Sequence, residues 1–340
     1  MAQSPNNLLF HSPTQQRVSL LSSLLATTMM VAAPGARAQS VLPQGGEVVA
    51  GAAMIATDGT HSTIVTQTSN RAVVDWNSFS VGQNNQVQFV QPTTQSAILN
   101  RVTGNATSTI AGQITGNGQV FLVNPNGIAI TATGSAKLGG GFVASTLDIA
   151  NSDFMNANLA FKGSGTAAEV ANAGAINIGK GGFAALLGGR VSNTGLISVP
   201  LGKVGLGAGE AATLDLYSDG FLQIALPSKA EGDDPLVKAA GSISGARIVI
   251  SAASLVGAVR DAVYVPGNLT AQGAYMDGGA IVLEGGAGTT TVTGRLDASS
   301  DAGKGGNIAI GGNSVALSGA SLNASGAQGG GQVTIGGGRH

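Results

Sequence analysis

The chain has 340 residues, of which 54 are glycine and 10% are charged, and its formal net charge is −1. This composition excludes a typical disordered chain, which is highly charged and weakly apolar. No basic stripe is present, which argues against nucleic-acid binding. Cysteine is absent, so stability must come from packing and hydrogen bonds. Apolar residues make up 43% and aromatic residues only 4%, which indicates a core of small aliphatic side chains in thin β-layers.

The first 38 residues have the pattern of a signal peptide. Residues 18–33 are apolar, Pro34 and Gly35 end that stretch, and Ala36-Arg37-Ala38 supplies the small residues of a cleavage site. A membrane anchor is the alternative, but the apolar stretch is short. No later run of 18 apolar residues exists, so we expect no membrane-spanning segment in the mature chain, which would start at Gln39.

The chain from residue 41 to 100 alternates apolar and polar residues in short bursts. Examples are Arg71 to Trp76 and Gln86 to Val90, and Gly and Asn residues separate them. Such period-2 runs bounded by turn residues predict strands. No helical period longer than two turns follows residue 39, so we expect little helix.

From about residue 110 the sequence repeats itself. Residues 171–178 recur as 192–199, and Phe183-Ala184-Ala185 aligns with Val204-Gly205-Leu206 at the same shift of 21. Residues 278–283 recur as 305–310 and again as 330–335. A period of 20–27 residues made of short strands predicts the coils of a parallel β-helix, because only stacking buries their inward Val, Ile and Leu. We expect Gly and Asn at the corners, where positive φ is often needed, and about eleven coils of ~22 residues.

Five segments resemble, in order, the secretion domain of filamentous-haemagglutinin-like exoproteins of two-partner secretion. They are Asp75 to Gly82, Ile98 to Gly104, Ile110 to Ile114, Gly118 to Ile128, which contains the Asn-Pro-Asn-Gly motif of that family, and Phe142 to Leu147. One departure is clear. Many members carry Asn-Pro-Asn-Leu where this chain reads Val90-Gln91-Pro92-Thr93-Thr94, so no recognition role is carried over from that second motif.

The resemblance implies an all-β fold, namely a single-stranded, right-handed parallel β-helix of the pectin-lyase-like kind with an antiparallel cap at its amino end. We expect residues 39–160 to form the secretion domain, 161–228 to continue as β-helix repeats, and 229–340 to hold glycine-rich repeats. The charged stretch from Lys229 to Lys238 is interpreted as an exposed loop between two β-helical sections. The last repeat strand is followed by no capping segment, so we expect a longer native protein.

The resemblance also implies a route of export and the residues that serve it. The chain would reach the periplasm and be recognised there by an outer-membrane β-barrel transporter with periplasmic receptor domains. It would then fold outside a Gram-negative cell, where its partner could be a host-cell or bacterial surface. The candidate secretion-motif residues are Asn124, Pro125, Asn126 and Gly127, together with Asn100 and Arg101. Taken alone, Asn124 to Gly127 is also a tight corner between strands.

Chemical motifs have simpler explanations. Gly174-x4-Gly179-Lys180 imitates a phosphate-binding loop, but it lies inside the 21-residue repeat with no helix pattern after it. Asp233-Asp234 fits a solvated loop better than a calcium site, and Asp148 and Asp153 fit turn caps better than a catalytic carboxylate pair. We therefore expect no catalytic residues, no metal and no cofactor, and we expect Trp76 and Phe79 to be core or end-cap side chains.

Three other classes of protein are compatible with parts of the sequence. A β-helical polysaccharide-active enzyme would need a cluster of carboxylates and basic residues on one face, and none is evident. An autotransporter passenger would need a carboxyl-terminal barrel, which is absent from the sequence. A haemolysin or contact-dependent toxin-delivery exoprotein would share the same amino-terminal region, so it remains the alternative to an adhesin-like exoprotein.

Overall fold

The computed structural model describes residues 41–217, 220–255, 257, 259–274 and 277–336. All of them belong to the compact unit Ala38–His340. The predicted signal peptide, residues 1–38, lies outside the described residues. Within the described ranges the chain is almost entirely β-strand and holds one short helix, α1 (Asn151–Met155), which confirms the low helix content expected from the sequence.

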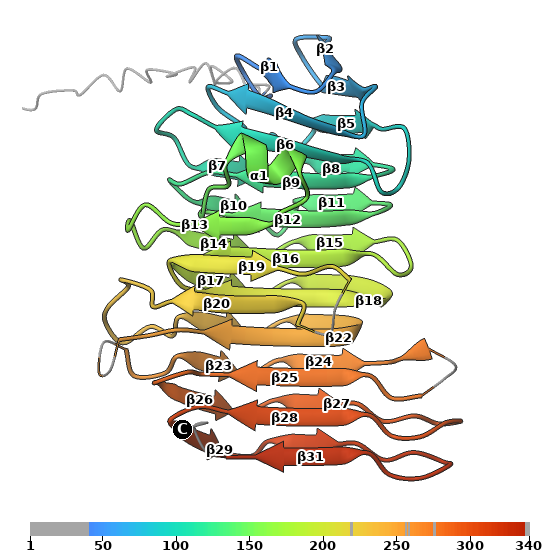
Figure 1. The fold of residues 1–340 in the computed structure, drawn as a ribbon, viewed down its shortest axis with the longest axis vertical. Helices are drawn as coiled ribbons and strands as arrows, with labels where there is room; N and C mark the ends of the chain where they lie inside the picture. Colours follow the sequence, from blue (N-terminus) through green and yellow to red (C-terminus); the bar gives the residue numbers. More distant parts are fainter. Residues whose placement is uncertain (1–40, 218–219, 256, 258, 275–276, 337–340) are drawn as a thin grey trace, which may run out of the picture. The chain divides into compact units, whose positions relative to one another are not determined.

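The strands stack into three faces, each made of parallel strands, and successive coils contribute a strand to each face (Figure 1). The first face contains β3 (Ser62–Gln67), β5 (Gln86–Val90), β8 (Gln113–Gly116), β11 (Ser135–Leu138), β15 (Ala175–Ile178), β18 (Leu196–Ala208), β22 (Ser242–Ala252), β24 (Asn268–Ala271), β27 (Arg295–Asp297) and β30 (Ser321–Asn323). This is the parallel β-helix that the repeats predict.

The second face contains β4 (Arg71–Trp76), β6 (Ala97–Val102), β9 (Gln119–Val123), β12 (Gly141–Ser145), β16 (Phe183–Gly188), the second halves of β18 and β22, β25 (Ala280–Glu284), β28 (Asn307–Gly311) and β31 (Gln332–Ile335). The third face contains β7 (Ser108–Ile110), β10 (Ile128–Ile130), β14 (Glu169–Asn172), β17 (Arg190–Asn193), β21 (Val237–Ala239), β23 (Val263–Val265), β26 (Thr289–Val292) and β29 (Ser314–Leu317). Inward side chains of all three faces form one continuous apolar core.

An antiparallel cap covers the amino-terminal end of the stack, as expected. β1 (Glu47–Ala50) pairs antiparallel with β4, and β2 (Ala53–Thr57) pairs antiparallel with β3. The ring of Trp76 stacks edge-on against Phe79 at 5.5 Å between centroids, and both rings are buried in this first part of the core. The expectation that these two rings serve packing is therefore confirmed.

The strand registers confirm most of the repeat alignments and correct one. Ile176 pairs with Ile197, and Ile281 with Ile308, at the shifts of 21 and 27 residues read from the sequence. Phe183, however, pairs with Lys203 rather than with Val204, because the corner before β18's second half is one residue shorter than the corner before β16. A one-residue slip moves a side chain to the other surface of the strand. Accordingly, Ala184 faces the interior and Phe183 faces outward.

Glycine lines one corner of the stack for a reason other than the expected positive φ. The glycines of this corner column are Gly134, Gly174, Gly195, Gly241, Gly267 and Gly294. A Cβ on Gly195 would lie 2.1 Å from the carbonyl oxygen of Gly174 one coil earlier, and Gly241 relates in the same way to Gly195 at 2.0 Å. None of the six has φ in the positive region. The column is required by close stacking of backbone on backbone, a role that only glycine fills.

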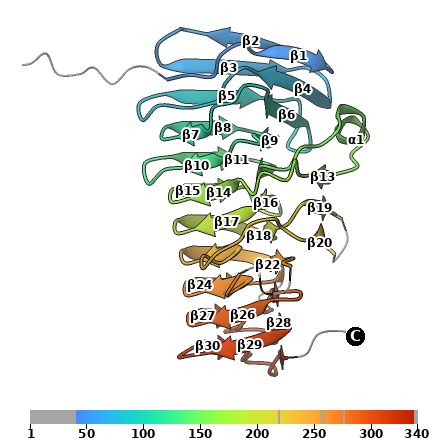
Figure 2. The same ribbon diagram turned by 90° about the vertical axis from the view of Figure 1, so that its left-hand side faces the viewer.

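A second apolar cluster lies outside the coils. Its floor is the outward surface of the second face, and its cover is built from α1, β13 (Ala160–Lys162), β19 (Ala211–Leu214) and β20 (Leu222–Leu226) (Figure 2). β19 pairs antiparallel with both β13 and β20. Phe154 of α1 stacks edge-on against Phe121 of β9 at 5.1 Å. This outer layer was not expected from the repeat pattern.

The charged stretch 229–238 does not separate two β-helical sections. β18 pairs directly with β22 across it, and Val237 to Ala239 within the same region forms β21. The excursion that makes β19 and β20 enlarges this one coil, so that Ser198 pairs with Ser244, 46 residues later. The first face therefore stacks ten described strands rather than the roughly eleven expected from a constant period.

Candidate functional site

The Asn-Pro-Asn-Gly segment is the turn between β9 and β10. Asn124 is fully buried at the start of this turn. Its Nδ2 donates to the carbonyl oxygen of Ala106 and to Oγ of Ser108, both at 2.9 Å. Its backbone N–H donates to the carbonyl oxygen of Ser145 at 2.9 Å, one coil further on. Asn124 therefore ties three consecutive coils together from inside the corner.

Asn126 and Gly127 complete the same turn. Oδ1 of Asn124 accepts hydrogen bonds from the backbone N–H and from Nδ2 of Asn126, each at 3.0 Å. Nδ2 of Asn126 also donates to the carbonyl oxygen of Gly104 at 2.9 Å. Gly127 has φ of +117°, a conformation that favours glycine, and its N–H donates to the carbonyl oxygen of Asn124 at 3.1 Å. Pro125 fixes φ at the turn and its carbonyl oxygen accepts from Oγ1 of Thr166.

Asn100 points into the core from β6. It is fully buried, and its Oδ1 accepts a hydrogen bond of 3.0 Å from Nε1 of Trp76. Its Nδ2 donates to the carbonyl oxygen of Phe121 at 3.3 Å. Because a buried amide without partners costs free energy, these bonds make Asn100 an internal partner for the indole of Trp76 in the first coil.

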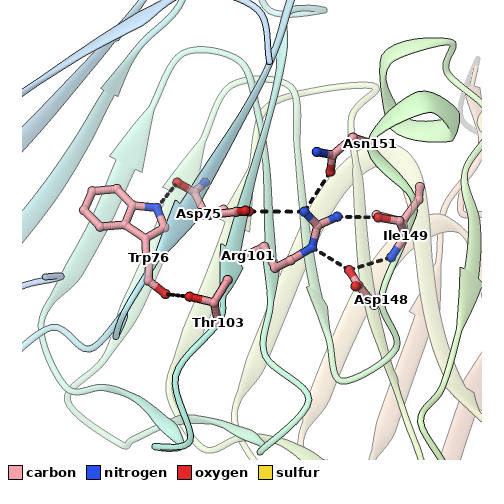
Figure 3. Close-up of polar contacts among 8 residues, drawn as sticks. Asp75, Trp76, Arg101, Thr103, Asp148, Ile149 and Asn151 are labelled. Carbon is pink, nitrogen blue, oxygen red and sulfur yellow. Dashed lines mark hydrogen bonds and ion pairs between the residues drawn. The ribbon is translucent and has the colours of Figure 1, made fainter. Parts of the chain in front are cut away.

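Arg101 follows Asn100 in β6, so its side chain lies on the other surface of the strand. It extends toward Asp148, Ile149 and Asn151 (Figure 3). Its guanidinium pairs with Asp75 of β4 at 3.1 Å and with Asp148 at 2.8 Å. It also donates to Oδ1 of Asn151 at 2.7 Å and to the carbonyl oxygen of Ile149. The side chain of Arg101 is only 13% exposed. It therefore clamps the segment leading into α1 onto coils that precede it by nearly fifty residues.

The structure brings the six predicted residues into two neighbouring coils but not onto one surface. The turn at Asn124 to Gly127 packs on the turn that follows β6, whereas the side chain of Arg101 bonds to residues of the outer layer. The sequence pattern does not indicate Ser108, Asp75 or Asn151 as partners, and it favours only a turn cap for Asp148. Asp75 stands inside a recognised motif, but no sequence spacing indicates that it shares Arg101 with Asp148.

At residues 90–94, where this chain lacks the second motif of the family, the structure has a buried hydrogen-bond network. Gln91 is 5% exposed, and its Nε2 donates to Oε1 of Gln67 at 2.9 Å and to the carbonyl oxygen of Ser96 at 2.8 Å. Its backbone N–H and carbonyl oxygen bond reciprocally to the side chain of Asn117 at 2.8 and 2.7 Å. At this corner the side chains of Gln67, Gln91 and Asn117 thus form a hydrogen-bonded amide network.

The residues that resemble a phosphate-binding loop or a carboxylate pair have structural roles in the fold. Gly174 and Gly179 are corners of one coil, and β16, not a helix, follows them. Asp148 and Asp153 do not meet: the first pairs with Arg101, and the second accepts from Nδ2 of Asn158. The part of the chain that the structure describes contains no group of three or more His, Asp or Glu side chains arranged to hold a metal ion. Nor does any helix in the described ranges combine the length and apolarity needed to span a bilayer.

Comparison with known proteins agrees with this architecture. The family model described as "TPS secretion domain" matches residues 39–298. Among solved structures, the HMW1 secretion domain from Haemophilus influenzae superposes with a TM-score of 0.66 at 32% identity, covering 86% of this chain and 76% of that one. The filamentous hemagglutinin secretion domain has a TM-score of 0.62 at 18% identity, covering 88% of this chain and all of that one, a likeness of fold alone.

Two curated relatives are heme/hemopexin-binding proteins from Haemophilus influenzae. One is 36% identical over 237 residues, which is 68% of this chain and 26% of the relative. The other is 34% identical over 133 residues, which is 39% of this chain and 14% of the relative. The chain thus spans about a quarter or less of the length of these relatives.

Fold and motifs together define the secretion domain of an exoprotein exported by two-partner secretion. Because the family model covers most of the chain, the chain belongs to the TPS secretion domain family. The fold is the parallel β-helix of these domains, and membership of the family gives the chain a secretion-targeting role in two-partner secretion.

Proposed function

We propose that this chain is the secretion-targeting region of an adhesin-like exoprotein that is exposed on, or released from, a Gram-negative cell. In this proposal an outer-membrane β-barrel partner recognises the chain through periplasmic receptor domains. The residues proposed to serve that step are Asn124, Pro125, Asn126 and Gly127, with Asn100 and Arg101. Residues 39–160 remain the proposed core of the targeting region, although the family match extends further.

One observation carries the mechanism: the side chains of Asn100, Arg101 and Asn124 have their hydrogen-bond partners within the folded protein, whereas Asn126 is exposed. Asn100 and Asn124 are fully buried, and the guanidinium of Arg101 has four protein partners. A receptor that bound these side chains in the folded protein would have to break hydrogen bonds and ion pairs that stabilise the fold. We therefore infer that the transporter reads the chain before it folds, and that the same residues then close the first coils outside the cell.

The activity of the whole exoprotein is a separate proposal. We favour an adhesin-like role in which the β-helix presents a long surface to a host-cell or bacterial partner. A haemolysin or contact-dependent toxin-delivery exoprotein is the alternative, and a β-helical polysaccharide-active enzyme is the weakest. The names of the curated relatives add haem or hemopexin binding as a fourth candidate, supported by their 36% and 34% identity to this chain.

The test is a secretion assay with a matched control. The full chain is expressed with and without its transporter partner, and the mature protein is measured in the medium and in the periplasm. The variant combines Asn124→Ala and Asn126→Ala. The control is Asn172→Ala, because Asn172 is also fully buried and bonds to Asn193 at 2.7 Å, but in a later coil outside the motif.

We expect partner-dependent appearance in the medium, loss with the double variant, and retention of secretion by the control. Equal loss in both would assign the motif to general folding rather than to recognition. Release without a partner would exclude two-partner secretion as the route. Undiminished secretion of the double variant would remove the motif residues from the proposal.

A further inference from the structure

The sequence contains two Asn-Gly bonds, Asn117-Gly118 and Asn126-Gly127, and both lie within the motif-bearing segment 118–128 or directly beside it. In a flexible chain the backbone nitrogen of a glycine after asparagine reaches the side-chain carbonyl carbon easily, because glycine has no Cβ to hinder the approach. A bond then forms between that nitrogen and Cγ, ammonia leaves, and a succinimide remains. Water opens the ring to Asp or isoaspartate, so the amide nitrogen is lost as ammonia and one water is consumed.

In the folded chain both reacting groups at Asn126 are held by hydrogen bonds to other residues. The attacking group, Gly127 N–H, donates to the carbonyl oxygen of Asn124 at 3.1 Å. The carboxamide of Asn126 is fixed through Nδ2 to the carbonyl oxygen of Gly104 at 2.9 Å and to Oδ1 of Asn124 at 3.0 Å. The residue itself is exposed, so water is not excluded. Protection must come from these hydrogen bonds rather than from burial.

The carboxamide of Asn117 is also held by hydrogen bonds, but by different partners. Its Nδ2 donates to the carbonyl oxygen of Gln91 at 2.7 Å, and its Oδ1 accepts from the N–H of Gln91 at 2.8 Å. It is also exposed to water. The chain therefore offers two chemically alike sites that are locked by independent contacts with the preceding coil.

We propose that Asn126 is a deamidation site that folding protects, so that the unfolded, export-competent chain has a limited chemical lifetime. This inference rests on the proposed export of an unfolded chain. A carboxylate at position 126 would lose both Nδ2 donors and face two acceptor oxygens, those of Gly104 and Asn124, at hydrogen-bond distance. Isoaspartate would also insert a backbone methylene into the tight turn. Either product damages the corner that the motif builds.

The experiment compares the chain lacking only its signal peptide in native buffer and in denaturing urea, both mildly alkaline. Peptides containing Asn117 and Asn126 are followed by mass spectrometry for replacement of the amide by a carboxyl group. Because modification of a locally opened segment follows the population of the open form, we expect the rate at Asn126 to be at least about tenfold slower in native buffer. Equal rates in the two conditions would overturn the proposal.

A variant identifies the contacts responsible. Asn124→Ala removes the acceptor Oδ1, so the native rate at Asn126 should rise while the rate at Asn117 stays unchanged. If circular dichroism shows that this variant does not fold, Thr107→Val replaces it. Oγ1 of Thr107 donates to the carbonyl oxygen of Asn126, which belongs to the same peptide unit as the attacking Gly127 nitrogen, so its loss should free that unit to rotate. No rise at Asn126 in a folded variant would contradict the proposed protection. The readout needs no transporter, so a negative result here would not change what the secretion assay shows about export.

Discussion

The amino-terminal and carboxyl-terminal coils belong to the same β-helix but differ in how their strands are buried. In β6, β9, β12 and β16 nearly every residue is buried, because the interior core lies on one side of these strands and the outer layer on the other. In β25 and β28 buried and more exposed residues alternate, because only the inward side is covered. The first region is thus a two-sided layer, and the second is a simple stack.

The contacts that hold the two regions differ in sequence range. Arg101 bonds to residues up to 50 positions away, and Arg71 donates to the carbonyl oxygen of Phe154, 83 positions away. In the later coils the corner glycines contact the adjacent coils, and Arg295 pairs with Asp297 two residues away. The early coils should therefore respond to distant changes, whereas the later coils should respond mainly to changes in adjacent coils.

The largest effect is expected from Gly195→Ala in the corner column. Its Cβ would meet the carbonyl oxygen of Gly174 at 2.1 Å, and backbone cannot move aside as a side chain can. We expect a loss of about 3 kcal/mol in the free energy of unfolding, measured by urea denaturation. Gly330→Ala is the control, because nothing lies within 4 Å of its Cβ position. Similar midpoints for the two variants would show that close stacking is not what requires glycine.

A smaller loss is expected from Arg101→Met, about 2 kcal/mol, because Asp75 and Asp148 lose their partner while the side chain of Asp148 is about half exposed. Hydrogen exchange should rise around α1 as well as in β6, since the clamp joins them. The matched control is Arg295→Met, whose pair with Asp297 is local and half exposed, and it should change stability by no more than about 0.5 kcal/mol. If both variants lose the same free energy, the contrast between long-range and local contacts is wrong.

The smallest effect concerns Asp58 in the turn between β2 and β3. The N–H groups of Ser62, Thr60 and His61 donate to its Oδ1 and lower its pKa to about 2. Because the folded pKa lies below the unfolded value of about 3.9, the stabilisation is complete above that value and disappears as the pH falls toward 2. NMR titration of the carboxyl group should give a midpoint near 2. In Asp58→Asn, the hydrogen-exchange rates of these three amides should no longer change as the pH passes through 2. A midpoint near 4 in the wild-type protein would contradict the lowered pKa.

Part of the candidate site could be predicted from sequence and part could not. The turn at Asn124 to Gly127 was predictable, because Pro and Asn-Gly encode a tight corner locally. The burial of Asn124 and its bonds to Ala106, Ser108 and Ser145 were not, because they depend on how coils of unequal length stack. Arg101 shows the same limit: its motif is visible in the sequence, but its partner Asp148 lies on an excursion whose path no period describes.

The sequence by itself determined the all-β class, the stacking of coils and most registers, because period-2 alternation and a repeat of 20–27 residues leave few other ways to bury the aliphatic residues. Only the tertiary structure decided the one-residue slip at Phe183, the continuity of the stack across residues 229–238, and the outer layer of α1, β13, β19 and β20. These features depend on loop lengths and on contacts between distant segments. Such contacts form only when the coils are already in place, so no local pattern records them.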